Sequence, residues 1–405
     1  MTLFGEESQS QPAQSKPANS FKLPEIPDLD AAKIGNARVS PPPGSAGADL
    51  STDLPVPFGP ASGGGGKISE GSSGEWIAAP IPFLKPTFGW GVAIGAAYIY
   101  QPLQDQTNAP PWITGVAGFY SANGSWGAGG GHKMNLGEDR WRLLFGGGYA
   151  NLNYEFFGIG SDAGNAGRSV AVNQRIGGGK IEVLRQIAGD WYAGIRYLAG
   201  NSRTRLDSPI TNVPSGMNLN ADELSANIAA LGLHVQRDSR DSQFYPTRGS
   251  LLDVEAQFFE EAFGSDFTFQ AYEVRYNKYV SLATNHVVAL RGFGRFTSGR
   301  VPFFALCSFG TGGDLRGYTP GRYRDKMMLA AQAESRWRLT ERFGVVAFAG
   351  IGGVAPAIDE FETLLPSGGL GARYVLAKKN NVSLRFDAAW GKNEHALYFG
   401  VGEAF

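Results

Sequence analysis

No stretch of this 405-residue chain is apolar for the roughly 18 residues that a transmembrane helix needs. The chain has one cysteine, Cys307, so an internal disulfide is excluded. Its formal net charge is -1, which gives no reason to expect nucleic acid as a partner. Residues 1–13 have neither a basic segment nor an apolar core, so no signal peptide is visible in this chain.

Residue types that carry catalysis or bind metals are scattered along the chain. The four histidines occupy separate segments without the spacing of metal ligands. They are His132, His234, His286 and His395. Asp241 and Ser242 share a turn, but no histidine lies near them in sequence to complete a catalytic triad. We therefore predict no enzyme activity, no metal and no cofactor.

Glycine and aromatic residues are abundant. The 57 glycines are about twice the usual share, and the aromatics comprise 26 Phe, 15 Tyr and 8 Trp. Together with few charges, this composition suits a closed sheet with small residues facing a lumen and aromatic girdles facing lipid. Residues 1–72 differ, because they are rich in Pro, Gly, Ser and Ala without any period. We predict a disordered tail or linker over 1–72 and a single barrel domain over 73–405.

A two-residue alternation begins near Trp76. In 89–101, Trp90, Val92 and Ile94 alternate with glycine and alanine over about twelve residues. That is about twice the length of a typical soluble strand and long enough to cross a bilayer at a tilt. Other alternating segments carry charges on one face, as the wall of a water-filled lumen does.

The alternation predicts sixteen strands, an even number that lets an antiparallel sheet close without exposed edges. The connections on one side of the predicted sheet are long and most of those on the other side are short, with 102–110 and 238–247 as exceptions, which is typical of a bacterial outer-membrane barrel. The predicted strands are 75–82, 89–101, 111–122, 125–135, 139–150, 168–186, 189–201, 221–237, 248–260, 266–280, 285–297, 327–338, 342–352, 367–377, 381–391 and 395–405.

Three stretches resemble the bacterial surface antigen barrel family, the superfamily of BamA and TamA. GGDLRGY at 312–318 resembles the VRGF/Y motif of that family's sixth outer loop. RDSRDSQFYPTRG at 237–249 resembles its Arg-Asp-rich turn. The closing strands, with GGLGARY at 368–374, LRFDAAWG at 384–391 and terminal Phe405, resemble its last strands. The resemblance covers about 75–405 and implies a sixteen-stranded barrel.

Two features depart from the family pattern. Residues 1–72 are not one of the periplasmic POTRA domains that family members usually carry. Where the thirteenth strand of the family often reads Phe-x-Asp, this chain reads Phe348-Ala349-Gly350, so the usual carboxylate partner of the loop arginine is missing.

The resemblance implies that a loop-lock motif folds into the lumen and is held there by Arg316. By alternation, Glu334 faces inward and is the first candidate for its partner, with Asp387 second. Arg336, Arg373 and Arg385 also face inward. The motif consists of Gly312, Gly313, Asp314, Leu315, Arg316, Gly317 and Tyr318.

The C-terminus ends on Phe405, which shares a face with Leu397, Phe399 and Val401 by alternation. Phe399 and Phe405 resemble the C-terminal signal that the barrel-assembly machinery reads. The charged Glu403 interrupts this face. The same residues fit a last lipid-facing strand equally well.

The resemblance implies a protein of the Gram-negative cell outer membrane that takes part in outer-membrane protein insertion, assembly or translocation. The implied partners are the lipid bilayer with its lipopolysaccharide, the barrel-assembly machinery during biogenesis, and a periplasmic partner or an unfolded outer-membrane protein. The alternative is a passive or structural pore whose lumen the sixth loop narrows. A soluble β-protein fits the absence of a visible signal peptide but fits neither the aromatic girdles nor the strand lengths.

Overall fold

Sixteen antiparallel strands form one sheet in sequence order, and two short strands form a second sheet. This computed structural model describes residues 75–85, 87–100, 112–206, 221–242, 245–310, 314–377 and 381–405. The predicted all-β fold with sixteen antiparallel strands is confirmed. The predicted tail at 1–72 lies outside the described residues. No described helix is both long and apolar enough to span a membrane.

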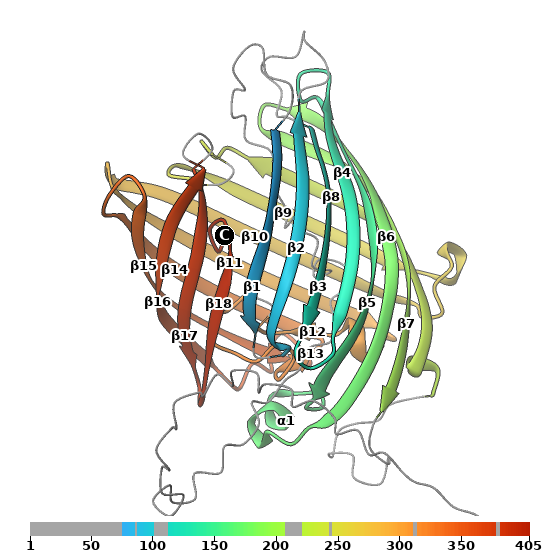
Figure 1. Cartoon of the computed structure of the whole chain (residues 1–405). Coiled ribbons are helices and arrows are strands. Elements are labelled where there is room, and N and C mark those ends of the chain that lie inside the picture. The colour runs from blue at the N-terminus through green and yellow to red at the C-terminus, as the bar shows by residue number, and fades with distance from the viewer. Residues whose placement is uncertain are drawn as a thin grey trace, which may run out of the picture. The chain divides into compact units, whose positions relative to one another are not determined.

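The sheet curls so that its first and last strands come close together (Figure 1). No ladder of hydrogen bonds joins β1 to β18 in the described part of the chain. The sixteen strands are β1 (Glu75–Lys85), β2 (Gly89–Tyr100), β3 (Trp112–Ser121), β4 (Trp126–Leu136), β5 (Trp141–Phe156), β6 (Val170–Ala188), β7 (Trp191–Leu206), β8 (Ser225–Asp238), β9 (Gly249–Phe259), β10 (Phe269–Ala283), β11 (His286–Gly299), β14 (Met327–Arg338), β15 (Phe343–Ala355), β16 (Leu365–Ala377), β17 (Val382–Gly391) and β18 (Glu394–Val401).

The remaining elements lie in the connections. They are α1 (Ser161–Ala166), η2 (Ala221–Leu224), η3 (Glu261–Phe263), η4 (Phe303–Ala305), β12 (Cys307–Ser308) and β13 (Arg324–Asp325). The two-residue strands β12 and β13 pair with each other between β11 and β14.

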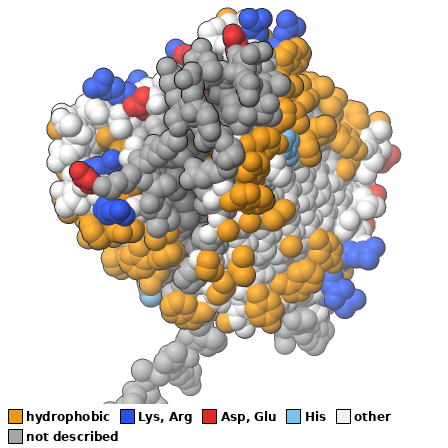
Figure 2. Space-filling view, turned by 45° about the horizontal axis from the view of Figure 1, so that its top comes forward, with side chains coloured by type: hydrophobic (Ala, Val, Ile, Leu, Met, Phe, Trp, Pro, Cys, Tyr) orange, Lys and Arg blue, Asp and Glu red, His pale blue; other side chains and the backbone are white. Residues whose placement is uncertain are grey.

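Each long strand turns its two faces to different surroundings. On β6, Ile181 is exposed on the outer wall while Glu182 is buried on the inner side. Figure 2 shows hydrophobic side chains over much of the visible outer wall, with charged side chains toward its edges. A wall that is apolar outside and polar inside is the pattern of a membrane barrel.

The polarity inverts toward one end of β5. Leu152, Tyr154 and Phe156 are buried on the inner side, whereas Asn153 and Glu155 lie on the outer side. The inner side there packs into an apolar cluster that includes Phe303 and Phe304. The apolar residues of this end are therefore covered by the chain itself and not by lipid.

Several predicted strand ends are wrong. β5 continues to Phe156, six residues beyond 150, and β7 continues to Leu206, five residues beyond 201, because their inner faces pack against the apolar cluster. β8 begins at Ser225 instead of 221, since η2 precedes it. β18 stops at Val401 instead of 405, because Gly402 turns with a positive φ of 85°.

Candidate functional site

The connection between β11 and β14, residues 300–326, is called the lumen loop here, because most of its described residues from 302 onward are buried inside the wall of strands. Phe303, Phe309 and Tyr318 are at most 2% exposed. Phe309, Leu315 and Tyr318 pack with Val354 and Leu365 of the strand wall in an apolar cluster. Of the predicted motif, Gly312 and Gly313 lie outside the described residues, and 314–318 are described.

Arg316 of the lumen loop reaches three strands and is 1% exposed. Its Nη2 donates to Glu334 on β14 at 2.5 Å, and its Nη1 donates to Asp387 on β17 at 2.7 Å. The guanidinium carbon lies 3.5 Å from the ring centroid of Phe348 on β15. The structure thus brings both candidate carboxylates to the same arginine and adds an aromatic face, an arrangement that favours a cation.

Six charged groups form a closed ring of alternating sign around this contact. From Glu334, the ring continues to Arg336 at 2.6 Å and then to Glu403 at 3.8 Å. Glu403 pairs with Arg373 at 2.8 Å, and Arg373 pairs with Asp387 at 2.6 Å. Arg316 completes the ring between Asp387 and Glu334. Three cations balance three anions, which lowers the cost of burying each of them.

Arg385, the remaining candidate, lies at the edge of this ring. Its Nε is 3.8 Å from Asp387 Oδ2, and that nitrogen has no hydrogen-bond partner in the described structure. It therefore adds positive charge near the ring but is not one of its links.

Gly317 and Tyr318 attach the loop to β16, to β18 and to the turn between β17 and β18. The Gly317 amide donates to the Tyr398 hydroxyl on β18 at 2.9 Å. The Tyr318 hydroxyl donates to the carbonyl of Pro366 on β16 at 2.5 Å and accepts from the Lys392 amide at 3.0 Å. Burial raises the pKa of Tyr318 to about 12, so the hydroxyl stays protonated and keeps its donor role.

The position of the missing carboxylate is filled by the loop itself. A Cβ on Gly350 would come within 2.7 Å of a Leu315 methyl group and 2.8 Å of the Ala331 carbonyl oxygen. Asp314 accepts the Gly310 amide at 2.8 Å, and its carbonyl accepts from the Gln332 side chain. Glu334 and Asp387 therefore balance the charge of Arg316, while the Leu315 side chain occupies the space next to Gly350.

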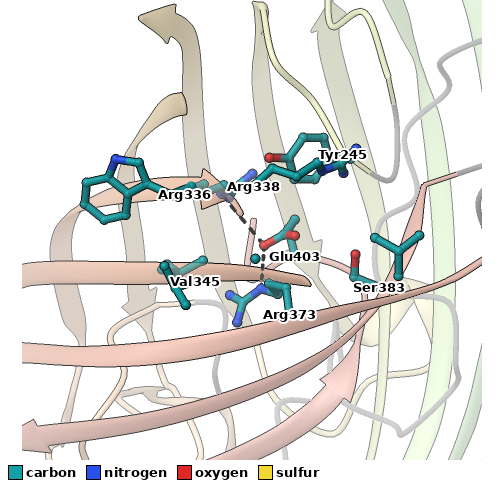
Figure 3. Close-up of a pocket in the computed structure, with 11 residues that line it drawn as sticks. Tyr245, Arg336, Arg338, Val345, Arg373, Ser383 and Glu403 are labelled. Atoms are coloured by element: carbon teal, nitrogen blue, oxygen red, sulfur yellow. Dashed lines mark hydrogen bonds and ion pairs between the residues drawn. The ribbon is translucent and has the colours of Figure 1, made fainter. Parts of the chain in front are cut away.

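The C-terminal residues turn into the lumen beside the ring. Figure 3 shows Glu403 between Arg336 and Arg373 in a pocket that Tyr245 also lines. The carbonyl oxygen of Phe405 accepts from Arg336 at 2.8 Å, and the Phe405 ring lies 5.5 Å from the same guanidinium. The prediction that Phe405 continues the outer face is therefore wrong, because the turn at Gly402 redirects the chain. Leu397 and Phe399 remain on the outer face of β18.

The Omp85 superfamily domain matches residues 135–405 of the chain, which is more than half of its length. The chain belongs to the Omp85 superfamily. Proteins of this superfamily are barrel transporters and assembly factors and not enzymes, so the prediction of no enzyme activity is confirmed at the level of the family. No curated protein sequence matched the chain.

Solved structures share the fold of this Omp85 barrel. BamA from Haemophilus ducreyi lacking POTRA domains 1–3 matches with a TM-score of 0.56 and 14% identity, over 81% of this chain and 70% of that one. CdiB from Escherichia coli matches with a TM-score of 0.55 and 11% identity, over 82% and 63%. CdiB from Acinetobacter baumannii matches with a TM-score of 0.53 and 14% identity, over 80% and 58%. The chain thus spans less than two thirds of either CdiB structure.

This Omp85 barrel holds a second charged cluster on β6 to β9 that sequence spacing missed. His234 lies between two carboxylates, with Nδ1 3.0 Å from Glu182 and Nε2 2.8 Å from Asp253. Arg196 donates to Glu182 at 2.6 Å and to Glu255 at 2.9 Å. His234, Asp253 and Glu255 place ligand atoms within 4.8 Å of one another, as metal ligands do. Both ring nitrogens already face carboxylates, which favours a doubly protonated imidazole over a metal ligand.

Sequence reasoning also missed the roles of Glu403, Phe348 and Tyr398 in the Omp85 barrel. For Glu403 the sequence held one indication. If the last strand continued, this carboxylate would face lipid, and that placement is so unfavourable that it indicates the strand has already ended. Phe348 and Tyr398 gave none, because an inward aromatic residue is equally consistent with simple packing.

Proposed function

We propose that this chain is a cell outer-membrane barrel that assists the insertion or translocation of outer-membrane proteins, with the lumen loop locked inside it. The proposal is supported by the Omp85 match over 135–405 and by the fold shared with BamA and CdiB. We call the attachment of the lumen loop inside the barrel the lock. The single observation that supports it is the pairing of Arg316 with Glu334 and Asp387. A loop held in this way narrows the lumen, and a passive pore with a narrowed lumen is the alternative that conductance separates from this proposal.

The seam between β1 and β18 supports a role in moving other chains. The two strands come close but share no ladder in the described residues. A sheet edge with unpaired backbone groups is able to accept a strand from another chain. The proposed partners are the bilayer with its lipopolysaccharide, an unfolded outer-membrane protein or a periplasmic partner, and the barrel-assembly machinery that first inserts this chain. Phe399 and Phe405 are the proposed signal that the barrel-assembly machinery recognises when it inserts this chain.

Single-channel conductance tests the lock. The wild-type barrel refolded into planar bilayers should show small or flickering conductance, and Arg316→Ala should raise it sharply because the loop loses its charge anchor. Arg342→Ala, which removes an exposed arginine from a turn, is the matched control and should behave as wild type. Large steady conductance in wild type, unchanged by Arg316→Ala, would identify a passive pore.

Insertion itself is tested with an unfolded client. A urea-unfolded outer-membrane protein should fold faster into vesicles that contain this barrel than into vesicles that contain an unrelated porin at equal density. Equal rates in the two kinds of vesicle would refute assembly activity while leaving the lock intact.

A further inference from the structure

Three arginines gather on the outer face of β6 and β7, and no carboxylate of the described residues pairs with any of them. Arg175 is the direct cross-strand partner of Arg203, and Arg205 lies two residues farther along β7. All three are exposed, and none has an ion-pair partner among the described residues. The outward carboxylate of β5, Glu155, pairs in register with Ala171, four positions from Arg175. Like charges directly opposite each other destabilise a sheet, so an anion bound between Arg175 and Arg203 would stabilise this part of the wall.

Aromatic residues mark the level of this cluster relative to the membrane. Trp141 and Tyr149 are 41% and 42% exposed on the outer face of β5, at the two ends of a nine-residue stretch. About nine to eleven strand residues cross the hydrocarbon core. Tyr149 pairs with Gly177 of β6, and Arg175 is the next outward residue beyond Gly177. Arg175 therefore lies just outside the hydrocarbon, where lipid headgroups lie.

The outer surface becomes polar at the same level. The Asn173 side chain donates to the side-chain oxygens of Asn151 at 2.9 Å and Asn153 at 2.7 Å, which gives a row of amides across β5 and β6. Asn151 is the register partner of Arg175, and Asn173 is that of Arg205. Amides beside arginines offer hydrogen bonds to sugar hydroxyls next to charge for phosphate.

The cluster lies at the end of the wall that carries the long connections. The segments that follow β5 and β7 and the lumen loop after β11 all leave from this end. In an outer-membrane barrel the long loops face the cell exterior. The arginines consequently face the outer leaflet.

We propose that Arg175, Arg203 and Arg205 bind the phosphate groups of a phosphorylated glycolipid of the outer leaflet. Guanidinium groups bind phosphate oxygens in pairs, and two opposed arginines are placed to hold one phosphate between them. This proposal rests on the outer-membrane placement of the barrel and not on the lock or on assembly activity. A barrel that fails to insert clients would still bind the lipid.

Binding of bisphosphorylated lipid A to the full refolded chain in zwitterionic detergent, followed by native mass spectrometry, tests the site. The double variant Arg175→Gln, Arg203→Gln should bind at least tenfold more weakly than wild type. Arg185→Gln, Arg237→Gln is the matched control, since it removes two exposed outer-face arginines that lie over Trp141 and Trp191 at the opposite rim. That control should bind as wild type.

Three further ligands separate the possible sources of phosphate. Dephosphorylated lipid A should bind at least tenfold more weakly than the bisphosphorylated form, and inorganic phosphate should compete only weakly. Phosphatidylglycerol binding as tightly as lipid A would overturn the glycolipid assignment, and unchanged lipid A binding by the double variant would overturn the site. If the double variant does not fold, judged by its heat-dependent mobility on SDS gels, Arg203→Gln alone carries the test with a several-fold loss expected.

Discussion

Gly317 and Gly391 face each other across the contact between the lumen loop and β17. A Cβ on Gly317 would lie 2.8 Å from the Trp390 carbonyl carbon and 2.9 Å from the Gly391 nitrogen, and one on Gly391 would lie 2.8 Å from the Gly317 carbonyl oxygen. Gly317 also has a positive φ of 103°. Both requirements favour glycine, and together they let the loop backbone lie directly on the strand.

Gly317→Ala should therefore release the lumen loop without dismantling the sheet. Strain at this φ costs on the order of 1–3 kcal/mol, and the overlap with the β17 backbone adds to it. We expect conductance to rise as in Arg316→Ala and the loop to become sensitive to protease, while the barrel keeps its folded mobility on gels. Gly292→Ala is the control, because nothing lies within 4 Å of its Cβ position. Equal conductance in the two variants would contradict this role of Gly317.

Glu403→Gln should loosen both the C-terminal tail and the lumen loop. It removes the only link of the ring between Arg336 and Arg373 and leaves two buried cations partly unbalanced. Breaking a buried ion pair costs roughly 3–5 kcal/mol, and water in the lumen reduces that value. The midpoint of urea unfolding should fall, and Asp359→Asn, which removes an exposed acidic charge, should leave it unchanged.

A double-mutant cycle shows whether the ring acts as a unit. Glu403→Gln and Arg316→Ala share no direct contact but are joined through Glu334 and Arg336 on one side and Asp387 and Arg373 on the other. Coupled residues deviate from additivity by roughly 0.5–3 kcal/mol. Strictly additive changes in unfolding free energy would mean that the loop and the tail are held independently.

Alternation along the strands was enough to predict much of the fold and the direction of the lumen side chains. Glu334 and Arg336 alternate with Ala333 and Trp337, and a two-residue period fixes which of them turn inward. What the period does not give is the distance between strands that are remote in sequence. Arg316 therefore had two candidate carboxylates on the sequence and contacts both in the structure.

The errors arose where the surroundings of a strand change along its length. Leu152 and Tyr154 of β5 are apolar and inward, the reverse of the membrane pattern, because the lumen loop covers them. If every apolar residue of a strand is assigned to the lipid-facing side, the strand is predicted to end where the apolar residues change to the inner side. The prediction for Phe405 was wrong for a related reason. Two-residue alternation places Phe405 on the outer face, but Gly402 turns the tail away from that face.

Gly350→Asp restores the carboxylate of the Phe-x-Asp pattern and should weaken the lock. The space is occupied by Leu315, and Arg316 already has two carboxylates within hydrogen-bond distance. Overpacking a filled site costs about 1–3 kcal/mol, so conductance should rise. Adding Leu315→Ala clears the space and should return part of the wild-type conductance. A single Gly350→Asp variant with lower conductance than wild type would show that Arg316 prefers the restored partner.

His234→Gln should destabilise a part of the strand wall that does not contact Arg316. The change leaves Glu182 and Asp253 without the cation between them, while Arg196 continues to hold Glu182 and Glu255. The loss of one member of a buried charged group is worth roughly 3–5 kcal/mol before screening by lumen water. The midpoint of urea unfolding should fall with the conductance unchanged, because the lock lies on other strands. His132→Gln, on the outer wall beside Thr114, is the control, and an equal fall in both variants would show that His234 is not part of a charged network.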